Sequence, residues 1–111
     1  MHELGLIQEV IAIAEQASAG QPVRKIVLEV GALALALPDA LEFAFELARE
    51  GTVAADATLE IVRVPGRARC RRCHAEIALE NAQAACPCGS HDLEWLSGEG
   101  IQVRALEVEA G

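Results

Sequence analysis

The sequence predicts an α+β fold in which two helices pack on a three-stranded sheet, with a zinc-ribbon-like module inserted before the last strand. Two stretches carry apolar residues at helical spacing, three others alternate as strands do, and all four cysteines fall in a single segment. Two helices are too few to cover both faces of a parallel sheet. We therefore expect a two-layer sandwich rather than a doubly wound fold.

The first helix is predicted from Leu4 to about Ala19, with Gly20 as its end. Glutamate and glutamine fill its wet side, and the first turn carries a carboxylate that suits the positive end of the helix dipole. Two apolar stripes give it a broad buried face. They are Leu4, Ile7, Ile11 and Ala14, and Leu6, Val10, Ile13 and Ala17.

The segment from Val23 to Gly31 is β-branched and alternating, which predicts a strand. Its inward residues are Ile26, Leu28 and Val30. The Ala-Leu repeat over residues 32–37 fits the strand period, whereas its residue types favour helix. We assign it to the strand end and a loop, because Pro38 disfavours helix at the residue before it and suits a first helical turn.

A second helix is predicted from Pro38 to about Glu50, with Gly51 as its stop signal. Its inward residues are Leu41, Ala44, Phe45 and Ala48. A strand should follow from Thr58 to Val64, where Pro65-Gly66 breaks it. In the last strand, from Ile101 to about Glu109, the apolar alternation slips by one residue, so we expect a bulge near Ala105.

If the last strand joins the sheet of the N-terminal part, residues 67–100 form an insertion. The expected domains are therefore 1–66 plus 101–111, which form the α+β domain, and 67–100, which form the inserted module. The inserted segment holds all four cysteines but little hydrophobic pattern. Such a segment needs a staple, because it cannot build a sufficient core of its own.

The cysteines form two close pairs, Cys70-Arg71-Arg72-Cys73 and, after twelve residues, Cys86-Pro87-Cys88-Gly89. Two pairs on tight turns can bring four thiolates to one cation, as in a zinc ribbon. Such a closed site leaves no position for an activated water, so the zinc would be structural. A thiol–disulfide site and unrelated buried cysteines are the alternatives. Because only a proline separates the second pair, His74 and His91 are kept as reserve ligands.

The first three residues, Met1-His2-Glu3, stand directly in front of the first helix. An α-amine, an imidazole and deprotonatable backbone amides can close a planar ring of nitrogen donors around Ni(II) or Cu(II). Zinc prefers a tetrahedral site and competes poorly for such a plane. By itself the tripeptide is weak evidence, since every chain starts with Met and some continue with His.

Composition excludes several classes of function. The net charge of -8 argues against general nucleic-acid binding. Arg63, Arg67, Arg69, Arg71 and Arg72 nevertheless cluster, either to offset nearby thiolates or to dock a partner. No nucleophile with a positioned base and no phosphate loop appears, so an enzyme is not expected. With no signal peptide or membrane-spanning run visible, we expect a cytoplasmic protein with reduced cysteines.

Taken together, these residues resemble the HypA/HybF family of nickel metallochaperones for hydrogenase maturation. Each shared motif is weak alone, whereas their order and spacing are specific. The motifs are Met1-His2-Glu3-Leu4, Val30-Gly31, Pro38-x-x-Leu41-x-Phe43-x-Phe45, Gly51-Thr52, Ala57-x-Leu59-x-Ile61, the cysteine pairs with Gly89-Ser90, and Ile101 leading into Glu107-Val108.

The resemblance implies nickel bound by the Met1 amine, His2 and the Glu3 backbone, and delivered to the large subunit of a [NiFe] hydrogenase. It also implies a structural zinc in the inserted module, at Cys70, Cys73, Cys86 and Cys88. A HypB-like GTPase would cooperate, and in some relatives the target is urease. The expected state is a monomer or weak homodimer, with no nucleic-acid or membrane partner.

Two departures from the family pattern qualify this expectation. Leu37 stands where the family often has a carboxylate, so no ligand role is carried over to that position, and the role of Asp39 stays open. The second cysteine pair is one residue shorter than usual. The alternative function is a zinc-ribbon protein or nucleic-acid docking module with no nickel role.

Overall fold

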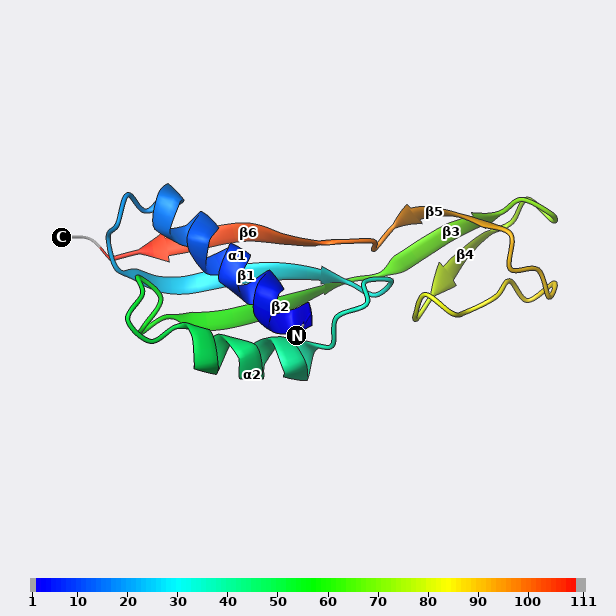
Figure 1. Cartoon of the computed structure of the whole chain (residues 1–111). Coiled ribbons are helices and arrows are strands. Elements are labelled where there is room, and N and C mark those ends of the chain that lie inside the picture. The colour runs from blue at the N-terminus through cyan, green and yellow to red at the C-terminus, as the bar shows by residue number, and fades with distance from the viewer. Residues whose placement is uncertain (1, 110–111) are drawn as a thin grey trace. The chain divides into compact units, whose positions relative to one another are not determined.

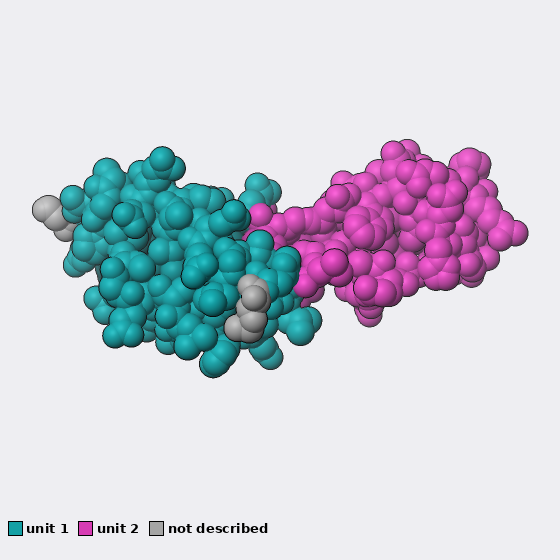
Figure 2. Space-filling model, in the orientation of Figure 1, with its two compact units in different colours: residues 1–28, 36–62, 102–111 teal, residues 29–35, 63–101 magenta. Residues whose placement is uncertain are grey.

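The computed structural model of the chain describes residues 2–109, which form two compact units (Figure 2). The first unit contains residues 1–28, 36–62 and 102–111, and the second contains residues 29–35 and 63–101. The inserted module expected from the sequence, residues 67–100, falls within the second unit. That unit also includes residues 29–35, 63–66 and 101.

Two helices, α1 (His2–Ala17) and α2 (Pro38–Ala48), contact each other beside a three-stranded sheet (Figure 1). Its order is β2 (Thr58–Val64), β1 (Val23–Gly31) and β6 (Ile101–Val108). The arrows in Figure 1 show β1 and β2 running in one direction and β6 in the other, so the sheet is mixed. The predicted α+β class, with two helices and three strands in this part, is confirmed.

Helix α1 buries one stripe of side chains, Ile7, Val10, Ile11 and Ala14. The prediction of a second buried stripe was wrong in part, since Ile13 is 50% exposed and Ala17 is exposed. The packed neighbours cover only one side of the helix, and these positions lie outside it. The helix ends at Ala17, and the left-handed residues Ala19 (φ 54°) and Gly20 (φ 81°) turn the chain away.

Inward positions of the other elements agree closely with the sequence pattern. In β1, Ile26, Leu28 and Val30 have no exposed surface, and residues 32–37 form a loop as expected. In α2, Leu41, Ala44 and Phe45 are buried, whereas Ala48 is half-buried. Helix α2 ends two residues before the predicted Glu50, and Gly51 follows with φ 76°.

The last strand shows the predicted slip in its burial pattern. Ile101 and Val103 are half-buried, Ala105 is exposed, and the next half-buried residue is Leu106. The covered face therefore shifts by one residue along β6. A bulge would produce this shift, and its location near Ala105 stays a prediction.

The second unit contains a further sheet that the sequence analysis missed. Strand β3 (Gly66–Cys70) pairs antiparallel with both β4 (Glu76–Leu79) and β5 (Leu93–Ser97). Its inward residues are Gly66, Ala68 and Cys70, which alternate with two exposed arginines. Small residues carry little hydrophobic signal, so the alternation did not appear as a strand. Pro65-Gly66 accordingly does not end the extended chain, because β3 begins at Gly66.

The core of this second unit is small. Its hydrophobic cluster consists of the buried Leu33, Ala68 and Leu79, and the half-buried Ile77, Ala84 and Leu93 pack against them. Burial of so few apolar side chains contributes little free energy compared with the conformational entropy that the chain loses on folding. The expectation that this segment needs a cross-link, such as a bound metal ion, therefore stays in place even though the unit has a sheet of its own.

Backbone segments of the second unit pass very close to one another at three glycines. A Cβ atom built on Gly31 would overlap the carbonyl group of Gly98, and one on Gly66 would lie 2.6 Å from the carbonyl oxygen of Leu79. The approach is fixed by hydrogen bonds from the Gly31 and Leu33 amides to the carbonyl oxygens of Gly100 and Gly98, each 2.8 Å long. Side chains have no room here.

Within residues 2–109, no helix combines the length and apolar character needed to cross a membrane.

Replacing Gly31 with alanine should lower the free energy of unfolding by about 2 kcal/mol or more, because the clash is with backbone that cannot rotate away. Gly100→Ala is the matched control, since nothing lies within 4 Å of a Cβ at that position. Urea unfolding and hydrogen exchange at the Leu33 amide measure the effect. Equal stability of the two variants would contradict the close approach.

Candidate metal centre

The four cysteines converge at one end of the second sheet. Cys70 is the last residue of β3, Cys73 lies in the turn that follows, and Cys86 and Cys88 lie in the loop between β4 and β5. All four sulfur atoms lie within 4.8 Å of one another. The Sγ atoms of Cys70 and Cys88 are 3.7 Å apart, those of Cys73 and Cys86 are 3.6 Å apart, and all four cysteines are free thiols.

These separations fit a tetrahedral zinc site. With Zn–S bonds of about 2.3 Å, the sulfurs at the corners of a tetrahedron are about 3.8 Å apart. Each sulfur of the shortened pair Cys86-Pro87-Cys88 therefore lies at a suitable distance from one sulfur of the first pair. Among the described residues, these cysteines form the only group of three or more metal-ligating side chains, and the exposed His74 and His91 lie outside it.

Two tight turns aim the sulfurs inward. In the first, the His74 amide donates to the carbonyl oxygen of Cys70 at 2.8 Å, and His74 adopts a left-handed φ of 65°. In the second, the Gly89 amide donates to the carbonyl oxygen of Cys86 at 2.8 Å, with a φ of 95° at Gly89. Glycine suits such a φ, whereas at His74 the turn holds a side chain in a conformation that costs free energy.

Hydrogen bonds and burial give the thiols of Cys70 and Cys86 different acidities. The backbone amide of Cys73, which lies 3.4 Å from the Cys70 sulfur, is the main reason that the pKa of Cys70 falls to about 6. At Cys86 the amide of Cys88 favours the thiolate, but burial and the neighbouring cysteines outweigh it and raise the pKa to about 12. Cys70 is therefore mostly a thiolate at neutral pH, whereas Cys86 needs a cation to lose its proton.

Two of the clustered arginines form ion pairs around this centre. Arg69 lies 3.7 Å from Glu76 across the β3–β4 pair, and Arg71 lies 3.0 Å from Asp92 while also donating to the carbonyl oxygen of Leu93. All four charged side chains are at least half exposed, so each pair adds little stability. Both interpretations of the arginine cluster, compensation of thiolate charge and docking of a partner, stay predictions.

The candidate nickel residues lie at the start of α1. His2 is the first residue of the helix and is exposed, and Glu3 is half-buried in the first turn. Met1, whose amine the sequence analysis assigned as a ligand, lies outside the described residues. Asp39 is exposed in the first turn of α2, and Leu37, at the departure from the family pattern, is 69% exposed.

Replacing His74 with asparagine distinguishes a role as a zinc ligand from a role as a left-handed turn residue. Asparagine tolerates the left-handed conformation but has no imidazole, so zinc content should stay at about one ion per chain with unchanged resistance to a chelator. Cys73→Ser is the matched control, because it removes one sulfur from the four, and it should lose zinc readily. Metal analysis after chelator challenge decides the matter, and zinc loss from His74→Asn would make His74 a ligand.

Nearly the whole chain is similar to proteins of one known family. Residues 1–108 match the family model described as "Hydrogenase/urease nickel incorporation, metallochaperone, hypA". A hydrogenase maturation factor HypA from Trichormus variabilis is 45% identical over 109 residues, covering 98% of this chain and 96% of the relative. Its counterpart from Geobacter metallireducens is 40% identical over 110 residues, covering 98% of this chain and 100% of the relative.

The solved solution structure of the Ni metallochaperone HypA from Helicobacter pylori has the same fold. It superposes with a TM-score of 0.70 at 23% sequence identity, covering 98% of each chain. The full-length family match and the two bacterial relatives together settle the classification. This chain belongs to the HypA family of hydrogenase and urease nickel-incorporation metallochaperones.

Proposed function

We propose that the chain binds one nickel ion at its amino-terminus and delivers it during maturation of a [NiFe] hydrogenase, the process in which its family acts. The observation that carries the proposal is the position of His2, exposed as the first residue of α1 in a chain that matches the family from residue 1. An exposed metal site at a chain terminus is open to a partner that takes over the cargo.

The helix start supplies the remaining donors. The first amides of a helix have no acceptor within the helix. The amides of His2 and Glu3 can therefore release their protons to solvent and bind a metal without breaking a helical hydrogen bond. Together with the Met1 amine and the His2 imidazole they make a planar nitrogen set, which suits Ni(II). Glu3 contributes through its backbone, which leaves its half-buried side chain out of the ligand set.

The four cysteines hold a structural zinc ion in this proposal. Their mutual distances suit tetrahedral coordination, and four thiolates leave no open position for a substrate or water. The ion would replace the large core that the second unit lacks. Two sites of different chemistry then keep cargo and structural metal apart.

Membership of the family connects the chain with the hydrogenase maturation machinery. Within that machinery we infer a HypB-like GTPase and the hydrogenase large subunit as partners, with urease as a second possible target. The relatives compared above are named for hydrogenase maturation, which favours the hydrogenase. A nucleic-acid docking role has no comparable support, since Arg69 and Arg71 are paired with carboxylates and the net charge is -8.

Adding one glycine ahead of Met1 displaces the α-amine and leaves helix, sheet and cysteines unchanged. Nickel affinity should fall by more than about a hundredfold, because losing even an outer-shell partner of a metal costs about ten- to a hundredfold. Titration calorimetry measures the affinity, and zinc content with far-UV circular dichroism checks that the fold is retained. Undiminished nickel binding by the extended chain would refute the terminal site.

Nickel affinity should also fall as the pH is lowered from 8 to 6. Protons compete with the metal for the amine and imidazole nitrogens, so acidification favours the empty, protonated site. Chelator competition at several pH values gives the profile, and zinc content over the same range serves as the control for unfolding. A flat profile would mean that neither nitrogen is a ligand.

A further inference from the structure

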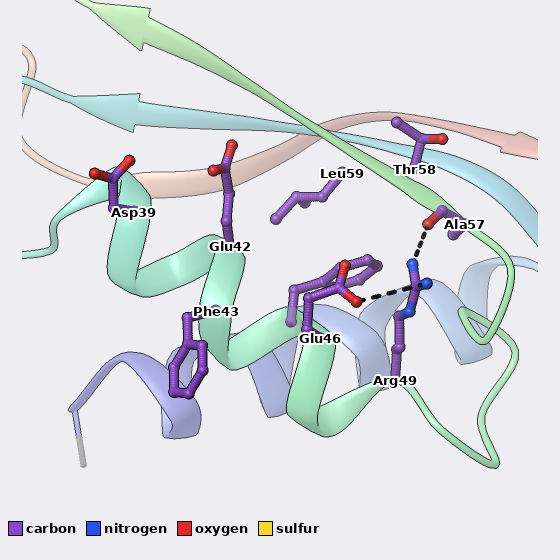
Figure 3. A pocket seen from close by; sticks show the side chains of 9 residues that line it. Asp39, Glu42, Phe43, Glu46, Arg49, Ala57, Thr58 and Leu59 are labelled. Atoms are coloured by element: carbon purple, nitrogen blue, oxygen red, sulfur yellow. Dashed lines mark hydrogen bonds and ion pairs between the residues drawn. The ribbon is translucent and has the colours of Figure 1, made fainter.

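A groove that neither metal site uses lies between α2 and β2, within the first unit (Figure 3). Its volume is about 550 Å³. The lining residues come from the helix, from the strand and from the segment leading into the strand. Those that matter here are Asp39, Glu42, Phe43, Glu46, Arg49 and Leu59.

Arg49 closes one end of this groove. Its guanidinium donates to the carbonyl oxygen of Ala57 at 2.9 Å, lies 3.7 Å from the Glu46 carboxylate and sits over the ring of Phe45 at 5.5 Å. These contacts tie the end of α2 to the residue just before β2. Arg49 therefore balances the negative charge of Glu46 at this end of the groove.

The other end is acidic and open. Asp39 and Glu42 point from α2 toward the strands in Figure 3, and both are exposed. Within residues 2–109, neither carboxylate has an ion-pair or hydrogen-bond partner. Two uncompensated negative charges therefore line the helix side of the groove.

The strand side of the groove is formed by β2, an edge strand of the sheet. Strand β2 comes first in the order β2-β1-β6, so among the described residues one of its edges pairs with no strand. None of its residues is buried, although Leu59, Ile61 and Val62 are aliphatic. It has no proline or lysine, and its two charged residues are Glu60, which lies 3.0 Å from Lys25 of β1, and Arg63. Open backbone groups beside half-covered aliphatic side chains are what an added strand requires.

We propose that this groove docks a basic, extended segment of a partner protein, which adds to β2 as a further strand and directs its lysine or arginine side chains at Asp39 and Glu42. Alternate residues of a strand face the same side, about 6.7 Å apart. Asp39 and Glu42 are separated by about 4.5 Å of helical rise, a difference that flexible basic side chains can span. The proposal stands independently of the nickel site.

Charge selects this occupant over others. The chain carries a net charge of -8, which attracts basic partners and repels acidic ones. A second copy offers Arg67 and Arg69 at strand spacing, but their strand β3 is already paired on both edges by β4 and β5. Asp39 and Glu42 also form no group of three metal-ligating side chains, so a metal ion is a poorer fit.

The test uses the full-length, metal-loaded chain and a capped fluorescent peptide of alternating lysine and valine, about ten residues long as strands are. Fluorescence anisotropy should show binding that the double variant Asp39→Asn/Glu42→Gln weakens about three- to tenfold. The matched control is Glu9→Gln/Glu15→Gln, which removes the same charge from exposed positions of α1 and should leave affinity within about twofold. A glutamate–valine peptide should not bind.

Backbone pairing has a separate readout. N-methylation of alternate residues along one edge of the peptide should abolish binding, while methylation along the other edge should not, because only one edge can pair with β2. Amide NMR shifts should concentrate at Leu59 and Ile61. Three results would overturn the proposal. The groove variant and the control variant could bind the peptide equally well, both methylated peptides could bind equally well, or spermidine at matched charge could displace the peptide. A chain dimer that the peptide dissociates would also overturn it, since the occupant would then be a second copy.

Discussion

Four cysteine sulfurs lie within 4.8 Å of one another in the second unit, where a bound cation would link its strands and loops. Its hydrophobic core cluster consists of Leu33, Ala68 and Leu79, and the inward residues of its central strand β3 are only glycine, alanine and cysteine. A closely packed group of thiolates is unfavourable by itself, because like charges repel, whereas a divalent cation at their centre reverses the balance. In the proposed function, a zinc ion would thereby supply stability that a larger hydrophobic core would otherwise provide.

This arrangement leaves the start of α1 free for a different chemistry. Soft sulfur donors at tetrahedral spacing suit zinc, whereas a plane of amine, amide and imidazole nitrogens suits Ni(II). His2 is exposed in the first unit and the cysteines lie in the second, so in the proposed function cargo binding and structural metal would be assigned to different units. The chemistry of the two donor sets, rather than affinity alone, would then keep each metal in its proposed site.

The first unit adds an electrostatic feature that the metal chemistry does not require. Arg49 neutralises one end of the groove between α2 and β2, while Asp39 and Glu42 leave the other end acidic beside an unpaired strand edge. In the proposed assignment this surface recognises a basic partner segment. Partner recognition would then rest on the framework of the first unit, and metal coordination on its terminus and on the second unit.

The sequence by itself determined the helices and strands of the first unit, most of their inward residues and the residues that meet in the cysteine cluster. Ile26, Leu28 and Val30 were predicted as inward and are fully buried, because alternation and helical periodicity are local properties of the chain. The motif order also identified the family. The terminal nickel ligands stay a proposal, since Met1 lies outside the described residues.

Tertiary structure alone decided what depends on neighbours distant in the sequence. Ile13 is half exposed because no described element covers its side of α1. Strand β3 is a central strand although its inward residues are only glycine, alanine and cysteine. The groove arises because β2 takes an edge position next to α2. Periodicity records which face of an element is apolar, whereas the partner of that face, and any edge left open, depends on packing between segments far apart in the chain.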